Sequence, residues 1–186
     1  MKVYFNLNPG GFSNCYIVAN EVSQEAVIID PGKVTEKLIS QIEDMNLKLS
    51  AVLITHNHGS HVDGLRTLRK IYNPRIYAGD WEVSKNETSL LSGDGTLKVG
   101  KMNVRFMSVP GHSSDSIVYI IENLIFTGDV ISAGEIGATT STYSEYILKT
   151  NIEEKIFSQT DTMLVMPGHG PPTSLGALKS FMELGI

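Results

Sequence analysis

The segment T-H-N-H-G-S-H at residues 55–61 places three of the chain's five histidines within six positions. It follows the apolar run S-A-V-L-I-T, which predicts a buried β-strand, so the histidines lie where this strand ends. Extended backbone repeats every two residues, and His56 and His58 should therefore point the same way. His61 comes just as the chain turns into a predicted helix. Any fold for this chain must accommodate a dense group of imidazoles at one strand end.

The remaining histidines and one carboxylate also follow predicted strands. His112 and His169 each come after a Pro-Gly pair, and Asp129 ends the strand in F-T-G-D-V. Imidazole is the commonest metal-ligating side chain, and Zn or Fe is well served by histidines with a carboxylate. Any one of these histidines could be an ordinary capping or surface residue, but the whole set favours metal binding.

Short β-rich runs alternate with stretches of helical periodicity, and turn residues separate them. The sequence predicts strands at residues 2–7, 14–19, 25–30, 50–55, 75–78, 104–109, 116–121, 124–127 and 162–166. It predicts helices at residues 34–45, 62–71 and 143–158, and a last helix from residue 174. Loop composition marks residues 79–95, with room for one helical turn, and residues 132–142. Two clusters of strands, each closed by helices, indicate packed sheets with helices outside. Because no linker divides them, we expect one domain over residues 1–186.

Composition narrows the class of protein. The net charge of −5 argues against nucleic acid as a partner, because binding to phosphate backbones needs clustered Lys and Arg. No apolar run approaches the roughly 20 residues of a membrane span, and the N-terminus turns polar too early for a signal peptide. The single cysteine, Cys15, fits a reducing cytoplasm and is expected to be a core residue. We expect a cytoplasmic protein that acts on a small-molecule substrate, with no nucleic acid and no membrane as partner.

The motifs resemble those of the metallo-β-lactamase superfamily, in particular its glyoxalase II-like (hydroxyacylglutathione hydrolase-like) members with a single domain. N-C-Y-I-V and V-I-I-D-P-G are similar to the family's opening strands, and T-H-N-H-G-S-H is similar to its T-H-x-H-x-D-H signature. P-G-H-S-S-D-S, F-T-G-D-V and P-G-H-G match its later motifs in the same order. The resemblance implies an α/β (α+β) fold, a four-layer αββα sandwich. It also implies a metal centre in the groove where both sheets end.

The resemblance also implies a ligand set. The first metal would be held by His56, His58 and His112, and the second by His61 and His169. Asp129 would bridge both metals and, with His58, count as a catalytic residue. The cofactor would be one or two zinc ions, with iron or manganese as alternatives. A hydroxide held by the metals would attack an electrophilic carbonyl, so no protein nucleophile is needed.

One position departs from the family pattern. Ser60 stands where the family has an aspartate that ligates the second metal. Ser60 and Asp63 fit a helix-capping pattern, in which Ser60 caps the next helix and Asp63 reaches back to it. Alternatively, Asp63 turns inward as a substitute ligand. The first site is complete in either case. Without Asp63 the second is weakened to three protein ligands, a number with which catalytic zinc sites can still operate.

Three functions are compatible with this ligand set. The favoured one is a metal-dependent hydrolase of thioesters or related esters. The weakened second site motivates a mono-iron enzyme resembling the family's persulfide dioxygenases, with His56, His112 and Asp129 as its facial triad. The third is a non-catalytic metal-binding module that kept the fold.

Residues around the expected groove carry weaker signals. Ala138 supplies no charge where related proteins often have a basic residue, which disfavours a strongly anionic substrate. Trp81, Tyr143 and Tyr146 could contact substrate, although ordinary packing is the favoured explanation for each aromatic side chain. Asp115 is either a turn residue or an orienting residue for a ligand, and the sequence does not decide between them.

A further carboxylate, Asp30, ends an apolar strand before a Pro-Gly pair. We interpret it as a turn and helix-entry residue whose placement could support the site.

Overall fold

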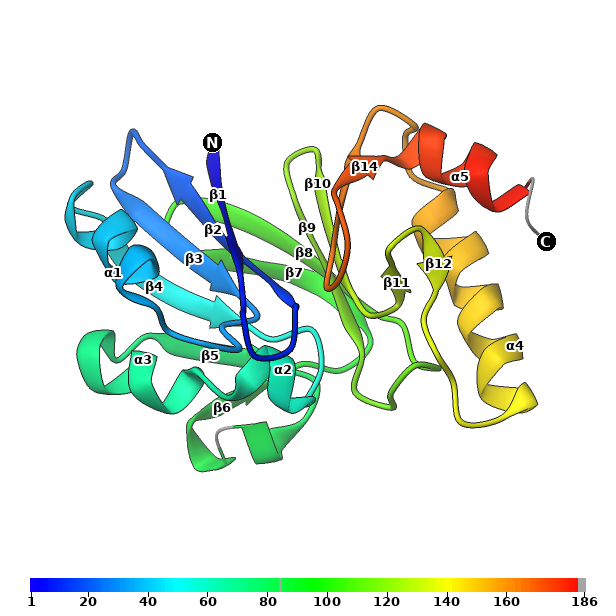
Figure 1. Ribbon diagram of the computed structural model, residues 1–186, viewed down its shortest axis with the longest axis horizontal. Coiled ribbons are helices and arrows are strands. Elements are labelled where there is room, and N and C mark those ends of the chain that lie inside the picture. Colours follow the sequence, from blue (N-terminus) through cyan, green and yellow to red (C-terminus); the bar gives the residue numbers. More distant parts are fainter. Residues whose placement is uncertain (84, 184–186) are drawn as a thin grey trace.

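The computed structural model describes residues 1–83 and 85–183. Two six-stranded sheets pack against each other, and helices cover the outer face of each sheet, as Figure 1 shows. This arrangement confirms the expected four-layer αββα sandwich. Within the described residues, no helix is long and apolar enough to cross a lipid bilayer.

The first sheet has the strand order β1-β2-β3-β4-β5-β6. Its strands are β1 (Lys2–Leu7), β2 (Asn14–Asn20), β3 (Glu25–Ile29), β4 (Lys48–Leu53), β5 (Arg75–Ala78) and β6 (Thr88–Leu90). Strands β1 to β3 pair antiparallel, whereas β3 to β6 pair parallel. Parallel neighbours need crossover connections, which here contain α1 (Glu36–Glu43), then α2 (Gly59–Val62) and α3 (Leu65–Tyr72).

The second sheet has the order β14-β13-β10-β9-β8-β7. Its strands are β7 (Asp94–Val99), β8 (Met102–Ser108), β9 (Ile117–Ile121), β10 (Leu124–Gly128), β13 (Leu164–Pro167) and β14 (Thr173–Ser174). A small hairpin, β11 (Ile131–Ser132) and β12 (Glu135–Ile136), follows β10. Helix α4 (Thr142–Asn151) runs on into a π-helical turn at Ile152–Phe157, and the last helix is α5 (Leu175–Glu183).

Three apolar layers hold these elements together. The central layer lies between the sheets and contains side chains of both, among them Tyr16 of β2 and Phe126 of β10, whose rings meet edge to face. A second layer packs the first sheet against α1 and α3, and a third packs the second sheet against α4 and α5. Strands between two such layers are buried on both faces, which explains their nearly continuous apolar runs.

Several local predictions were wrong. Residues 79–95, expected as loop, contain two short 3-10 turns, Trp81–Val83 and Lys85–Glu87, as well as β6 and the start of β7. The helix predicted over residues 62–71 is present as α3 but begins three residues later, after the separate short helix α2. Residues 132–142, expected as loop, include most of the β11–β12 hairpin. Polar composition does not distinguish an edge strand such as β6 from loop, because an edge strand is exposed.

Hydrogen bonds join the two sheets at the end where the histidines lie. The hydroxyl of Tyr16 donates to the carbonyl oxygen of Pro167 at 2.8 Å. The Tyr119 hydroxyl donates to the carbonyl oxygen of Ile54 at 2.9 Å, and the backbone amide of Ile117 donates to Thr55 at 2.8 Å. The first bond joins β2 to the end of β13, and the other two fix the segment after β4 against the second sheet.

We predict that Tyr119→Phe lowers the free energy of unfolding by about 1–2 kcal/mol, because it leaves a buried carbonyl without its donor. Tyr119 is fully buried. Urea denaturation measures the change, with Tyr146→Phe, on an exposed tyrosine, as the matched control. Equal stability of the two variants would contradict this role of the hydroxyl.

Candidate metal centre

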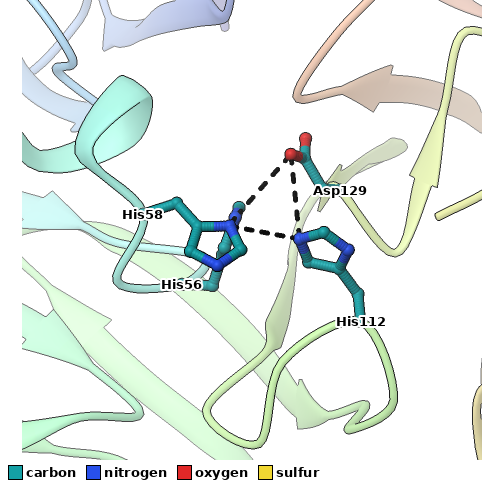
Figure 2. Close-up of side chains that lie close together, drawn as sticks. All are labelled: His56, His58, His112 and Asp129. Carbon is teal, nitrogen blue, oxygen red and sulfur yellow. Dashed lines mark hydrogen bonds and ion pairs between the residues drawn. The ribbon is translucent and has the colours of Figure 1, made fainter. Parts of the chain in front are cut away.

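Four side chains from three separate loops converge in a first group: His56, His58, His112 and Asp129, shown in Figure 2. His56 Nε2 lies 2.8 Å from His58 Nδ1, which lies 3.3 Å from His112 Nε2. The Oδ2 atom of Asp129 lies 3.7 Å from His56 Nε2 and 3.9 Å from His112 Nε2. The loops after β4, β8 and β10 supply these residues, so both sheets contribute.

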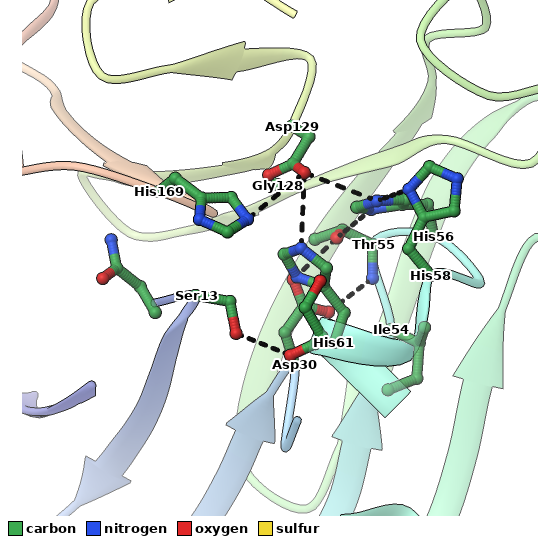
Figure 3. A network of polar contacts seen from close by, with 12 residues as sticks. Ser13, Asp30, Ile54, Thr55, His56, His58, His61, Gly128, Asp129 and His169 are labelled. Carbon is green, nitrogen blue, oxygen red and sulfur yellow. Dashed lines mark hydrogen bonds and ion pairs between the residues drawn. The ribbon is translucent and has the colours of Figure 1, made fainter. Parts of the chain in front are cut away.

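A second group shares Asp129 with the first, as Figure 3 shows. The same Oδ2 atom lies 3.4 Å from His61 Nε2 and 3.5 Å from His169 Nε2. His61 comes from α2 and His169 from the loop after β13. The structure therefore brings together all six residues predicted as metal ligands, and Asp129 lies between the two groups as the resemblance implied.

Hydrogen bonds on the far side of the rings decide which nitrogen faces the centre. His112 Nδ1 donates to the carbonyl oxygen of Ala138 at 2.8 Å, and His169 Nδ1 donates to that of Phe12 at 3.1 Å. A carbonyl can only accept, so in both rings the proton is on Nδ1 and the Nε2 lone pair is directed inward. These two rings are therefore preset as ligands.

The two buried histidines are oriented through Asp30. Its Oδ2 atom accepts from His61 Nδ1 at 3.0 Å and from the Thr55 hydroxyl at 2.6 Å. Because the Thr55 hydroxyl donates its proton to Asp30, its oxygen acts as the acceptor toward His56 Nδ1, which lies 3.1 Å away. The ring proton of His56 is therefore on Nδ1. The other carboxylate oxygen of Asp30 accepts the backbone amide of Thr55 at 2.8 Å. Asp30 thus holds both the turn before His56 and the tautomer of His61, which confirms that it supports the site.

The geometry fits a small transition-metal ion. A tetrahedron of nitrogen and oxygen ligands about 2.0–2.1 Å from zinc has edges of about 3.4 Å, and the distances between neighbouring ligand atoms, 2.8 to 3.9 Å, bracket this value. His61 Nε2 is buried and makes no hydrogen bond with the described residues. Its nearest polar neighbour is Asp129 Oδ2 at 3.4 Å. A buried polar atom without a hydrogen bond is costly, and a cation bound between these two atoms would satisfy both.

Electrostatics also favour a cation here. Burial lowers the pKa of His61, but the charges of Asp30 and Asp129 outweigh burial and raise it to about 10. Burial, together with the neighbouring His61 cation, lowers the pKa of His56 to about 2. Burial favours protonation of Asp129, but contact with His61 and His56 holds the pKa of its carboxyl well below the usual range. Without a metal, His61 thus keeps a second ring proton between two carboxylates, at a position where a metal cation would take its place.

The capping prediction for Ser60 and Asp63 was wrong. The N-cap of α2 is His58, without a side-chain cap, and Ser60 lies inside the helix. The carbonyl oxygen of Ser60 accepts the Ser13 hydroxyl at 2.5 Å. Asp63 is exposed and belongs to neither ligand group. Its carboxylate lies beside Gly59 instead: a Cβ atom placed on this glycine would be 3.2 Å from both carboxylate oxygens. Neither residue restores the missing carboxylate, so the second group has three protein ligands.

Sequence reasoning missed several residues that hold the ligands in place. The hydroxyl of Ser132 donates to Asp129 Oδ1 at 3.1 Å, which leaves Oδ2 for the histidines. The backbone carbonyls of Phe12 and Ala138 gave no signal, because any residue supplies a carbonyl. Phe12 has φ of 53°, a left-handed conformation that is unusual for a bulky side chain.

The loop that carries His58 is fixed through Asn57. The backbone amide of Asn57 donates to Asp115 Oδ2 at 2.8 Å, and its side-chain amide donates to Asp80 Oδ2 at 3.0 Å. Asp115 therefore orients a ligand loop, which decides between its two sequence interpretations.

The aromatic side chains and the cysteine occupy ordinary positions. The side chains of Trp81, Tyr143 and Tyr146 are all more than half exposed. Their contact with substrate stays a prediction. Cys15 is fully buried, and burial raises the pKa of its thiol, as expected for a core residue.

Comparisons with known proteins agree with this geometry. The family model of the Metallo-beta-lactamase superfamily matches residues 8–182. The probable metallo-hydrolase YqgX of Bacillus subtilis (strain 168) is 28% identical over 186 residues, covering 88% of this chain and 87% of that protein. The hydroxyacylglutathione hydrolase GloC of Haemophilus influenzae is 28% identical over 190 residues, covering 89% of each. The crystal structure of BLEG-1 B3 metallo-beta-lactamase superposes with a TM-score of 0.82 at 27% identity, covering 94% of this chain and 95% of that one.

We predict that Asp30→Asn weakens metal binding about 10- to 100-fold, although the side chain keeps its shape. An amide nitrogen in place of Oδ2 cannot accept from Thr55 and His61, and His61 is forced to carry its proton on the nitrogen that faces the centre. Competition with a chromophoric chelator measures the affinity, with the exposed Asp44→Asn as control. Unchanged affinity in Asp30→Asn would refute this role.

Proposed function

We propose that this chain, which belongs to the metallo-beta-lactamase superfamily, cleaves thioesters or related esters with metal ions held by its histidine cluster. The family and the metallo-hydrolase relatives support a metal-dependent hydrolase. The observation that carries the finer proposal is the convergence of four imidazoles on one carboxylate oxygen, with the ring protons of these four directed outward and a fifth imidazole, His58, beside two of them. The glyoxalase II-like motifs and the similarity to GloC add support for a thioester.

In this proposal zinc is the metal, with iron or manganese as alternatives, because imidazole with a carboxylate suits all three in different degrees. His56, His58, His112 and Asp129 would hold the first ion as a complete four-ligand set. When bound, the ions would lower the pKa of a water molecule and polarise the substrate carbonyl.

The chain's own residues would provide shape and access. His56 and His61 are almost completely buried, whereas His58 is exposed and about a third of the His169 side chain is exposed. Substrate would therefore approach from the side of His58 and His169. The buried side, closed by Asp30 and Thr55, excludes water and keeps the ligand atoms in position before substrate arrives.

Ser60 makes the two ion positions unequal. The second group offers His61, His169 and a share of Asp129, three ligands with an open position, which is the pattern of catalytic rather than structural zinc. We infer one tightly held and one loosely held ion. The weaker second group also favours the alternative function, a mono-iron enzyme resembling persulfide dioxygenases, in which residues of the first group alone would bind the metal.

The surroundings favour an acyl substrate of low negative charge. The segment from Ser132 to Tyr143 borders His112 through the Ala138 carbonyl and contains no Lys or Arg. Asp80 and Asp115, which hold the His58 loop, add negative charge on the other side. A strongly anionic thioester would be repelled here.

We predict that His58→Ala lowers the rate of thioester hydrolysis at least about 100-fold, since it removes a ligand on the substrate side. An assay with an acyl-glutathione and an uncharged acyl thioester measures the loss. Lys37→Ala, on the exposed face of α1, is the control. Removing metal with a chelator should abolish activity in the wild type, and adding zinc back should restore it.

Full turnover in His58→Ala, or in chelator-treated protein, would contradict the hydrolase. Oxygen consumption by iron-loaded protein with glutathione persulfide, without thioester cleavage, would favour the mono-iron enzyme. Metal binding without either reaction would favour a non-catalytic module.

A further inference from the structure

A cavity of about 530 Å³ lies at the end of the sandwich where β4 and β5 begin. Strand β4 runs from this end toward α2, as Figure 1 shows, and β5 is parallel to it. His56 and His58 lie in the loop between β4 and α2. From Ser50 to His56 the chain advances six residues, roughly 20 Å for extended backbone. This distal cavity is therefore separate from the metal centre, and its volume suits a small metabolite.

Three basic side chains line the distal cavity: Lys48 of β4, Arg75 of β5 and Lys98 of β7. All three are exposed, and within residues 1–83 and 85–183 none of them forms an ion pair. The one acidic residue of the lining is Glu25, which accepts the backbone amide of Lys101 at 2.9 Å. The lining thus has a formal charge of +2 in a chain whose net charge is −5.

Ser50 also lines the distal cavity. Ala26 of β3 pairs with Leu49, and Val27 pairs with Ala51, so Ser50 between them is the extra residue of a β-bulge. Such bulges redirect a side chain. The Ser50 Oγ atom is buried and makes no hydrogen bond with the described residues. An unsatisfied buried hydroxyl is destabilising, and a rotation of the Ser50 side chain that turns Oγ into the cavity would let a ligand oxygen satisfy it.

We propose that the distal cavity binds the phosphate group of a small organic phosphate. A doubly charged phosphate matches the +2 charge of the lining. Arg75 can bind two of its oxygens at once, Lys48 and Lys98 supply further charge, and the Ser50 hydroxyl supplies a neutral donor. This site is independent of the proposed hydrolysis, because it uses none of the metal ligands.

Calorimetric titration of the metal-loaded protein with inorganic phosphate tests the proposal, at constant ionic strength. We expect saturable binding that is about tenfold or more weaker in Arg75→Ala and in Lys98→Ala, because each change removes a charged hydrogen-bond donor. Lys101→Ala, on a neighbouring lysine outside the lining, should bind like the wild type. His58→Ala should also retain the binding, which separates this site from phosphate bound at the metal centre.

A second pair of variants tests the hydroxyl. Ser50→Ala should weaken phosphate binding several-fold without lowering the melting temperature of the free protein, because the hydroxyl has no partner to lose. Ser23→Ala is the matched control, since Ser23 Oγ is also buried and unpaired within the described residues but lies outside the lining. Equal affinity in wild type, Arg75→Ala and Lys98→Ala, or no binding of phosphate at all, would overturn the proposal. Loss of binding in His58→Ala alone would assign phosphate to the metal centre and equally overturn it.

Discussion

The rest of the centre depends on the hydrogen bonds that the buried carboxylate of Asp30 accepts. It joins the end of β3 to the loop after β4 through Thr55, and it fixes His61 with the correct nitrogen inward. Its own backbone has φ of 52°, a conformation that aspartate tolerates better than most residues. A carboxylate of this kind is stable in a core only when every oxygen has a donor. Here the hydrogen bonds that satisfy the carboxylate also position two imidazoles.

The two sheets make the centre possible because neither sheet carries all the ligands. The first sheet supplies His56, His58 and His61, and the second supplies His112, Asp129 and His169. Only a rigid junction between the sheets keeps these ligand atoms within 4.8 Å of one another in each group. The hydrogen bonds from Tyr16, Tyr119 and Ile117 across that junction are therefore part of the site as much as of the fold.

The sequence predicted which side chains converge, because the chemistry of these candidate ligands and their position at strand ends are both visible in one chain. It also predicted the layers, since buried strands and amphipathic helices have distinct periods. It failed where partners are backbone atoms, as for the carbonyls of Phe12 and Ala138, and where local patterns compete. Ser60 and Asp63 match a capping motif, yet the helix begins at Gly59, and the tertiary contact of Ser13 with Ser60 holds the turn instead. The single-domain organisation and the cytoplasmic location stay predictions.

The central claim is a metal centre with one complete and one three-ligand group. Metal content tests it most directly, measured by plasma mass spectrometry on protein purified without a metal-affinity tag, before and after dialysis. The account predicts about two equivalents of metal when the protein is loaded with zinc and about one after dialysis, because the second ion has three protein ligands. Protein that retains no metal before dialysis and takes up none on loading would contradict it.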